Sequence, residues 1–415
     1  MEVLPLNAIV YNQDKVDMKD VVAPPYDVID SKYQDDLYAR SEFNIVKLIL
    51  TKGENRYEDA KKYFEDWKEK EVLVQTKKPS IFYIVQKYTN EKGKTIERKG
   101  FIARNKIEDF ESKKILPHEF TMGGPKQDRL NLVTSTGAFF SQIFMVYNDQ
   151  EQKIEKMAEK YIAQKPYMDV TDDLGVQNLV YLIDDEEDIK VIEKTLEDKT
   201  LLIADGHHRY ETSMNYARAH KDNEYAQYVM SYFTNAADEN LIIYPTHRII
   251  EKEIDTNELL KKVEKHYEIE KMTDKEAFLE RIEEENKKQI TTGLILKNDE
   301  NYYVLKLKQG VKETIDTPQV LQKLDLTVLH EIILKKELGF SQEELMAQDG
   351  VKYEKQEHVS FESVKSGKAS ACFIMAYPKM QDIIDISQEG LRMPQKSTYF
   401  YPKLLSGVVI NPLKG

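Results

Sequence analysis

The stretch that decides the fold is residues 201–212, LLIADGHHRYET. The apolar run 201–204 predicts a buried strand, and the dipeptide Asp205-Gly206 that follows it is a turn signal. From residue 207 to about residue 220, apolar side chains recur at helical spacing. The sequence therefore predicts a strand, a tight turn and a helix. The first turn of that helix carries His207, His208 and Arg209.

This turn has the chemistry of an anion site. The first amides of a helix have no partner within the helix and lie at the positive end of its dipole, which favours a phosphate. Arg209 adds a planar fork that can bind two phosphate oxygens. Asp205, at the end of the strand, can bind a metal ion or accept a proton. These residues alone leave a second interpretation open, in which the aspartate only caps a solvated helix start.

The composition indicates a globular protein of two or three domains. Its 415 residues include 41% hydrophobic and 10% aromatic residues, which is enough to bury a core. The net charge of −13 argues against a nucleic-acid partner, because duplex-DNA binders show a basic face. The single cysteine, Cys372, excludes an internal disulfide and a multi-cysteine zinc site, and it fits a reducing compartment.

The N-terminal residues and the apolar runs bear on localisation. The segment MEVLPLNAIVYNQDK lacks the basic start and apolar centre of a signal peptide. No apolar run approaches the ~20 residues that span a bilayer. We therefore expect a cytoplasmic protein without a membrane partner. The oligomeric state stays open, with a homodimer among the alternatives.

Strands and helices are interleaved along the chain, which predicts an α+β (mixed α/β) fold. Strands are expected at 2–11, 138–147, 178–184, 225–236 and 241–250, the last broken by Pro245, and a hairpin over 80–107. Helices are expected at 55–71, 150–164, 186–197, 256–267, 274–287, 318–338 and 380–389. Residues 115–132 are expected to form a long irregular segment, and a change to highly charged helices predicts a domain boundary near residue 250.

Five segments in order resemble the domain of unknown function 1015 family. They are APPYDVI (23–29), PHEFTMGGPKQDRLNL (117–132), ADGHHRYET (204–212), PTHR (245–248) and MPQKSTYFYPKL (393–404). That family is related to ParB and sulfiredoxin proteins. The opening EVLPLNAIVYN is similar to a first ParB-type strand, and Gly206 and Arg209 match the Gly-x-x-Arg phosphate motif of that superfamily. Its free-serine kinases carry an Asp-Gly-His-x-Arg turn, which this chain reproduces at Asp205 to Arg209.

The resemblance implies an architecture and an activity. Residues 1–250 would form a ParB/sulfiredoxin-like catalytic core, made of 1–50 and 200–250 with an inserted subdomain at about 80–195. Residues 251–415 would form a C-terminal α/β domain that closes the site. The implied activity is that of a small-molecule kinase that phosphorylates free L-serine to O-phosphoserine, with ATP, ADP or pyrophosphate as donor and Mg²⁺ as cofactor.

Phosphoryl transfer requires alignment, charge neutralisation and usually magnesium, and each role has candidate residues. The catalytic candidates are Asp205, His207, His208, His118 and Glu119. The candidates for binding phosphate or nucleotide are Gly206, Arg209, Lys126, Arg129, His247, Arg248, Lys396, Ser397 and Lys403. The candidates for binding Mg²⁺ are Asp205, Asp128 and Glu119. The resemblance also implies a catalytic carboxylate early in the chain, for which Glu42, Asp27 and Asp30 are the candidates.

Structural roles compete with several of these assignments. His118 and Glu119 can serve a turn, His247 and Arg248 can pair with an acid, and the C-terminal lysines can be surface residues. A ParB-like nucleotide-binding regulatory or DNA-partitioning protein is the alternative function, and a phosphatase or phospholyase that uses the same anion pocket is a third. The chain has neither a Gly-x-x-x-x-Gly-Lys-Ser/Thr loop nor a Gly-x-Ser-x-Gly elbow.

Overall fold

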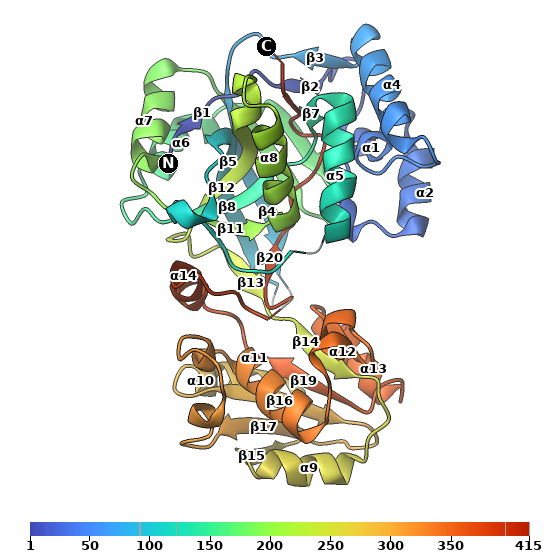
Figure 1. The fold of residues 1–415 in the computed structure, drawn as a ribbon, viewed down its shortest axis with the longest axis vertical. Coiled ribbons are helices and arrows are strands. Elements are labelled where there is room, and N and C mark those ends of the chain that lie inside the picture. The colour runs from blue at the N-terminus through green and yellow to red at the C-terminus, as the bar shows by residue number, and fades with distance from the viewer. Residues whose placement is uncertain (91–92, 122, 395, 415) are drawn as a thin grey trace. The chain divides into compact units, whose positions relative to one another are not determined.

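The computed structural model describes residues 1–90, 93–121, 123–394 and 396–414 (Figure 1). The chain divides into two compact units. Unit 1 comprises Met1–Pro117, Thr121–Ile242 and Pro402–Gly415, and unit 2 comprises His118–Phe120 and Ile243–Tyr401. The predicted change near residue 250 is close to the break after Ile242. Residues 402–415 follow unit 2 in sequence but belong to unit 1, because they pair with strands and bridges of that unit.

Unit 1 is built on a mixed sheet that orders its strands, among the described residues, as β6-β11-β8-β12-β5-β4-β10-β9, with β1 added beside β5. The pairs β6·β11 and β8·β12 are parallel and the other pairs are antiparallel. The strands are β1 (Val3–Leu4), β4 (Ile81–Thr89), β5 (Thr95–Lys106), β6 (Ile115–Pro117), β8 (Ile143–Tyr147), β9 (Met168–Thr171), β10 (Gln177–Ile183), β11 (Leu201–Asp205) and β12 (Tyr228–Asn235).

The regions that the resemblance assigns to a core and to an insertion share this sheet. Strands β11 and β12 lie within 200–250, and both pair with β8, which lies within 80–195. The two regions therefore form one hydrogen-bonded layer. The turn residues 91 and 92 of the predicted hairpin lie outside the described residues, and the hairpin strands β4 and β5 pair in register from Phe82 with Ile102 to Thr89 with Thr95.

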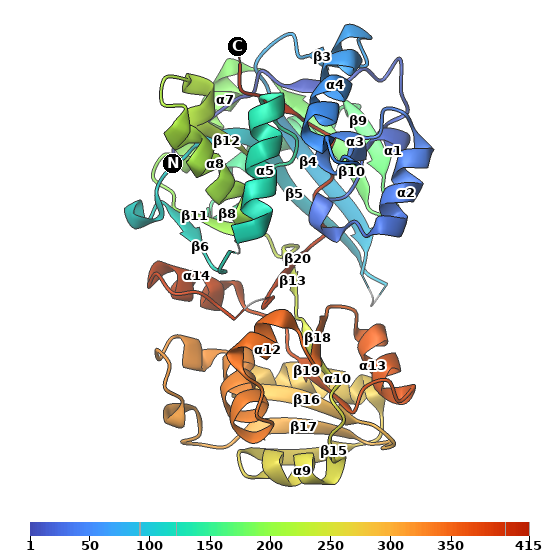
Figure 2. The same ribbon diagram turned by 45° about the vertical axis from the view of Figure 1, so that its right-hand side comes forward.

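Helices cover the sheet of unit 1. α5 and α8 lie side by side over it in both views (Figures 1 and 2). β4, β5, β8 and β12 are buried along most of their length, and α8 packs against β8 and β12. The helices are α1 (Met18–Val21), α2 (Ser31–Arg40), α3 (Val46–Ile49), α4 (Arg56–Glu69), α5 (Gly123–Thr136), α6 (Lys153–Ile162), α7 (Glu186–Leu196) and α8 (His207–Ala219), with 3-10 turns η1 (Tyr26–Val28), η2 (Phe110–Ser112) and η3 (Glu224–Gln227).

Two short strand pairs tie the chain ends of unit 1 to its body. β2 (Ile9–Tyr11) pairs with β3 (Leu73–Gln75), and β7 (Ala138–Phe139) pairs with β21 (Asn411–Pro412). The expectation of one irregular segment over 115–132 is wrong, because β6 and most of α5 occupy it. Glycine and proline suggest a loop there, but proline is tolerated in the first turn of a helix.

Unit 2 holds an antiparallel sheet with strand order β15-β17-β16-β19-β14-β18. Its strands are β14 (His247–Ile250), β15 (Tyr267–Met272), β16 (Thr291–Leu296), β17 (Tyr302–Leu307), β18 (Val351–Glu354) and β19 (Ala371–Met375), and β13 (Ile242–Tyr244) pairs separately with β20 (Tyr399–Tyr401). Its helices are α9 (Thr256–Glu264), α10 (Lys275–Asn286), α11 (Asp325–Val328), α12 (Gln342–Ala347), α13 (Glu357–Lys365) and α14 (Met380–Gln388), with the shorter turns η4 (Lys312–Thr314) and η5 (Leu321–Lys323). The two sheets with their helices confirm the predicted α+β fold.

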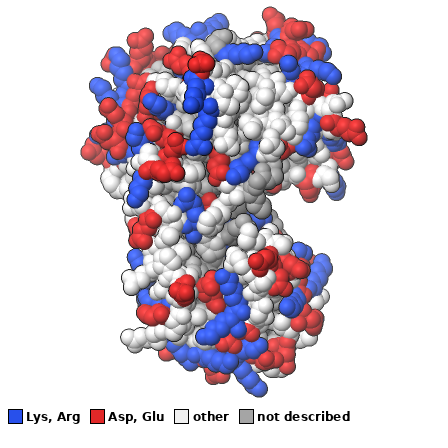
Figure 3. Space-filling model, viewed as in Figure 1, with Lys and Arg blue, Asp and Glu red and all other residues white. Residues whose placement is uncertain are grey.

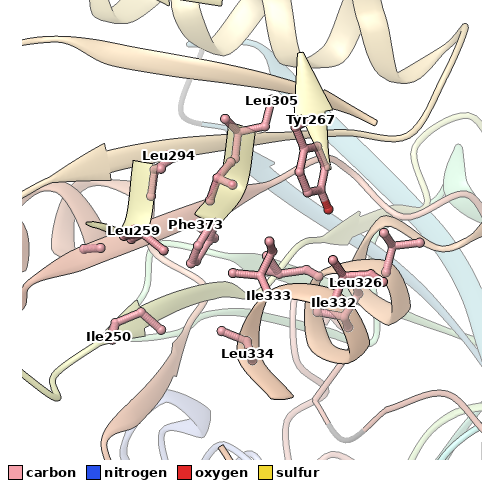
Figure 4. Close-up of a cluster of buried hydrophobic side chains, with 14 of the residues drawn as sticks. Ile250, Leu259, Tyr267, Leu294, Leu305, Leu326, Ile332, Ile333, Leu334 and Phe373 are labelled. Carbon is pink, nitrogen blue, oxygen red and sulfur yellow. The ribbon is translucent and has the colours of Figure 1, made fainter. Parts of the chain in front are cut away.

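The core of unit 2 lies between one face of its sheet and the segment that follows α11. Figure 4 shows side chains of β16, β17 and β19, among them Leu294, Leu305 and Phe373, facing Ile332 and Ile333. The expected single helix over 318–338 is wrong. The chain is extended at Leu324, and from Leu329 to Glu337 it forms a π-helix, η6. None of the helices among the described residues has the length and apolar character needed to cross a bilayer.

Candidate functional site

The strand, turn and helix predicted at 201–212 are confirmed in unit 1. β11 ends at Asp205, Gly206 turns the chain, and α8 begins at His207. Gly206 has φ 91°, in the left-handed region that side chains disfavour. A Cβ atom at this position would also lie 3.0 Å from the guanidinium group of Arg209. Glycine is therefore favoured here both by the backbone conformation and by the close approach of Arg209.

Asp205 forms the centre of a partly buried ion cluster at this turn. Its Oδ2 accepts from Nη2 of Arg209 at 2.7 Å, and its Oδ1 accepts from Nζ of Lys403 at 2.7 Å. Nη1 of Arg209 also donates to the carbonyl oxygen of Gln142. Burial alone would raise the pKa of Asp205, but Lys403 and Arg209 hold it well below its usual range. Asp205 is thus a charged carboxylate that fixes two cations at the start of α8, and it is poorly suited to accept a proton.

Lys403 reaches Asp205 because the backbone around it is anchored to the sheet. Nη2 of Arg98, on β5, donates to the carbonyl oxygen of Pro402 at 2.7 Å. Nε2 of Gln86, on β4, lies 3.4 Å from the carbonyl oxygen of Lys403. Arg98 is fully buried and also donates to Oε1 of Gln86 at 3.1 Å through Nε. Sequence reasoning missed Arg98, since a lone arginine in a strand gives no local signal of burial.

A second group of polar side chains joins α5 to α8. Oε2 of Glu211 accepts from Nζ of Lys126 at 2.7 Å, and Oε1 of Glu211 accepts from the hydroxyl of Thr121 at 2.7 Å. His208 is half-buried, and burial lowers its pKa despite the opposing field of Glu211. Its imidazole is therefore mainly neutral at neutral pH and can accept a proton. His207 is buried and acts electrostatically on Asp205.

The motif APPYDVI contributes to the same region through η1. The guanidinium group of Arg129 stacks on the ring of Tyr26 with 4.1 Å to the ring centroid. Arg209 and Arg129 both act electrostatically on Tyr26, and Asp27 acts on His208. A pocket of about 40 Å³ is lined by these two arginines and Tyr26. This volume is far below the roughly 300–1,000 Å³ of pockets for drug-sized ligands, so only a small group fits beside Arg209.

The structure separates the three early carboxylates. Asp27 is the one that lies near His208. Asp30 accepts from the backbone amide of Tyr33 at 2.8 Å and caps α2. Glu42 acts electrostatically on Lys47 of α3.

The two aspartates predicted to bind Mg²⁺ are both engaged with cations. Asp128 pairs with Arg129, with Arg56 at 2.9 Å, and accepts from the hydroxyl of Tyr57 at 2.8 Å. Both oxygens of Asp205 are likewise used by Arg209 and Lys403. Within the described ranges, no group of three histidine, cysteine, aspartate or glutamate residues could hold a metal ion. The residues that the structure describes therefore do not fit a preformed magnesium site.

The remaining predicted residues belong to unit 2, and His118 and Glu119 are two of them. His118 is fully buried, and its Nε2 lies 2.9 Å from the hydroxyl of Thr398. Its carbonyl oxygen accepts from the amide of Met393 at 2.9 Å. Glu119 approaches the ring of His118 at 3.9 Å. His118 thus ties the segment before α5 to the C-terminal motif within unit 2.

The motif PTHR supplies core residues of unit 2. Nδ1 of His247 accepts from the amide of Met375 at 3.1 Å, and burial and Arg248 lower the pKa of His247 to about 3. Arg248 is fully buried, donates through Nε to His330 at 3.1 Å, and stacks on Tyr353 with 4.2 Å to the ring centroid. Burial lowers the pKa of Arg248 to about 10. The donors of Arg248 are taken by His330, by the hydroxyl and carbonyl oxygens of Thr246 and by the carbonyl oxygen of Lys396.

Lys396 and Ser397 both take part in hydrogen bonds of unit 2, Lys396 through its carbonyl oxygen and Ser397 through its hydroxyl. The carbonyl oxygen of Lys396 accepts from the hydroxyl of Thr246 and, at 3.3 Å, from Nη2 of Arg248, while the Lys396 side chain is exposed. The hydroxyl of Ser397 donates to the carbonyl oxygen of Pro394. Met122 and Gln395, within two of the motifs, lie outside the described residues. That the C-terminal domain closes the site around the turn at Gly206 stays a prediction.

Comparisons with known proteins place the chain in a family. A model of the family described as "Protein of unknown function (DUF1015)" matches residues 3–327. No curated protein matches the chain. Among solved structures, the chain is similar to a free serine kinase in complex with AMP at 16% identity and TM-score 0.36, over 73% of this chain and 89% of that chain.

Two further solved structures are similar to the chain. One is a conserved hypothetical protein from Pyrococcus furiosus, at 16% identity and TM-score 0.34, over 73% of this chain and 93% of that chain. The other is SbnI with C-terminal truncation from Staphylococcus aureus, at 8% identity and TM-score 0.36, over 75% of this chain and 87% of that chain.

Proposed function

The chain belongs to the family of proteins of unknown function DUF1015, and from this premise we propose that it is a phosphotransferase that acts on a small hydroxyl-bearing molecule. The acceptor proposed is free L-serine, which would yield O-phosphoserine. The donor proposed is ATP, ADP or pyrophosphate. The observation that carries the proposal is the turn between β11 and α8, where a glycine in the left-handed region, a helix start and two oriented cations come together.

The turn supports binding of a phosphate for electrostatic reasons. The first amides of α8 lie at the positive end of a 13-residue helix, whose Ncap residue, Gly206, offers no side chain to cap them. Arg209 and Lys403 are held by Asp205 within reach of this helix start. An incoming phosphate would share these cations with Asp205, and preorganised cations stabilise the charge that develops during transfer without reorganising. Asp205 is then a positioning residue.

The acceptor requires a group that takes its proton. In the proposed step the hydroxyl oxygen attacks the terminal phosphorus of the donor, the bond from that phosphorus to the bridging oxygen breaks, and the hydroxyl proton passes to the imidazole of His208. Burial keeps His208 neutral at neutral pH, and Asp27 lies near enough to stabilise the imidazolium that forms. His208 is one of the catalytic candidates that the sequence offers.

The direct test uses the full chain, Mg²⁺, L-serine and each donor in turn, with phosphorus NMR as the readout. The expected result is a phosphoserine signal with at least one donor. Arg209→Ala should lower kcat/KM about 100-fold or more, because oriented cations and donors commonly contribute that much to transfer. Arg209→Lys should recover part of the loss, since it keeps the charge without the fork.

A matched control separates lost catalysis from lost folding. Lys70→Ala removes a cation from an exposed pair with Asp66 in the same unit and should leave the rate unchanged. Trp67 is the single tryptophan and is buried in unit 1, so its fluorescence reports whether this unit stays folded in each variant. Absence of phosphoserine with every donor would overturn the proposal, as would full activity of Arg209→Ala.

The charge distribution of the described residues does not favour a DNA-partitioning function. On the face shown in Figure 3, lysine and arginine side chains of the described residues are interspersed with aspartate and glutamate. Duplex-DNA binders instead gather their cations along one face. We therefore propose the phosphotransferase alone.

A further inference from the structure

Unit 2 contains a pocket that has no role in the proposed reaction. Its volume is about 240 Å³, and every residue that lines it belongs to unit 2. The walls come from the end of α10 and the residues after it, from η4, from the junction of η5 and α11, from the start of α14, and from Met393 and Ser397 of the C-terminal motif. The pocket is therefore built from five separate segments of one folded unit.

The lining of this pocket is unusually basic for the chain. The whole sequence has a net charge of −13, yet the pocket is lined by five lysines and two aspartates. The lysines are Lys287, Lys288, Lys312, Lys323 and Lys379, and the aspartates are Asp325 and Asp382. Lysines converging on one cavity raise the local potential and attract anions, and lysine is a common binder of phosphate.

Among the described residues, one of the five lysines, Lys288, is committed to an ion pair. Lys288 pairs with Glu285 at 2.9 Å, and Nζ of Lys379 donates to the carbonyl oxygen of Asn286 at 3.3 Å. Among the described residues, no acid lies within ion-pair distance of the remaining three, which are Lys287, Lys312 and Lys323. These three side chains are exposed, so their ammonium groups are open to an anion that enters from solvent.

The acids near the pocket do not cancel this charge. Burial raises the pKa of Asp382 despite the nearby Lys379 and Lys323. Asp325 accepts from the amide of Leu326 at 2.7 Å, so its carboxylate serves the start of α11. α14 also begins at the pocket, and no side chain caps its first amides.

We propose that this pocket binds a small molecule that carries a phosphate or diphosphate group. The cavity is smaller than the roughly 300–1,000 Å³ of pockets for drug-sized ligands, which favours a compact phosphate ester or diphosphate over a larger ligand. The site is distinct in its residues from the turn at Gly206, and the proposal does not depend on the phosphotransferase activity.

The test titrates the full chain with inorganic pyrophosphate by calorimetry. The Arg209→Ala background is used, so that binding at the turn before α8 does not contribute. In this background we expect pyrophosphate to bind, and Lys312→Gln combined with Lys323→Gln to weaken the affinity about tenfold or more, since hydrogen bonds to charged groups are the strong ones. Raising the salt concentration should weaken binding as well.

The matched control removes the same charge elsewhere in unit 2. Lys261 and Lys336 are exposed and do not line the pocket, so Lys261→Gln with Lys336→Gln should leave the affinity unchanged. Protection of the buried thiol of Cys372 from modification shows that unit 2 stays folded in each variant. The proposal is overturned if pyrophosphate does not bind in the Arg209→Ala background, or if both pairs of substitutions weaken binding equally.

Discussion

Replacing Lys403 by methionine should destabilise unit 1 through the carboxylate that it leaves behind. Lys403 and Arg209 each lie 2.7 Å from an oxygen of Asp205, and the three side chains are 15%, 11% and 22% exposed. Methionine keeps most of the apolar stem of lysine and removes its charge. The variant therefore reports mainly on the lost ion pair, because the packing volume changes little.

The magnitude follows from how far Asp205 is shielded from water. Removing one partner of a buried pair costs about 3–5 kcal/mol, whereas an exposed pair contributes about 0–1 kcal/mol. Asp205 is partly shielded and keeps Arg209 as a second partner. We therefore expect Lys403→Met to lower the free energy of unfolding of unit 1 by about 2 kcal/mol at neutral pH.

The assay is urea denaturation followed by the fluorescence of Trp67. This residue is the single tryptophan, is 1% exposed on α4 and belongs to unit 1, so its signal follows that unit. The control is Lys70→Met, which breaks a 2.8 Å pair with Asp66 whose side chains are 53% and 46% exposed. It should change the free energy of unfolding by no more than about 0.5 kcal/mol.

A double-mutant cycle isolates the pair. If the reasoning holds, Lys403→Met should cost much less in an Asp205→Asn background, because the carboxylate that it strands is then absent. The reasoning is refuted if Lys403→Met destabilises no more than Lys70→Met. It is also refuted if the two substitutions at Lys403 and Asp205 are additive.

Three further results are expected. Lys403 and Arg209 overcome burial and hold the pKa of Asp205 below its unfolded value of about 3.9, so its stabilising contribution is present above about pH 4 and lost as the pH falls through the folded pKa. The difference in unfolding free energy between wild type and Asp205→Asn, followed by Trp67 fluorescence, should stay constant above about pH 5 and shrink as the pH falls from about 4 towards 2. A difference that stays constant down to pH 2 would contradict this. Gly206→Ala should destabilise unit 1 by about 1–3 kcal/mol. It should cost more than Gly53→Ala, because Gly53 has a similar φ of 92° but no atom within 4 Å of its Cβ position. Equal losses of stability in the two variants would rule out a contribution from the contact with Arg209. Cys372 is fully buried and burial raises the pKa of its thiol, so a thiol reagent should label it only when unit 2 opens in urea, and rapid labelling in native buffer would disprove this.

Local sequence patterns determined the elements of this protein and part of its candidate site. Residues 201–219 read as strand, turn and helix because burial, a glycine turn and helical spacing are properties of neighbouring residues. Pro245 separates β13 from β14 as expected, since proline cannot continue a central strand. The family membership was also within reach of the sequence, because five motifs occur in order along the chain.

The tertiary structure alone decided which charges meet. Lys403 lies 198 residues from Asp205 in sequence. It reaches Asp205 because Arg98 and Gln86 hold the carbonyl oxygens of Pro402 and Lys403. Arg248 was a candidate phosphate ligand in the sequence, yet it is fully buried and donates to His330.

Spacing along the chain carries no information on such pairs. The pairing of distant strands sets the distance between two charged side chains, and burial sets the strength of their interaction. The charged pairs therefore follow from the folded sheets and not from a local pattern.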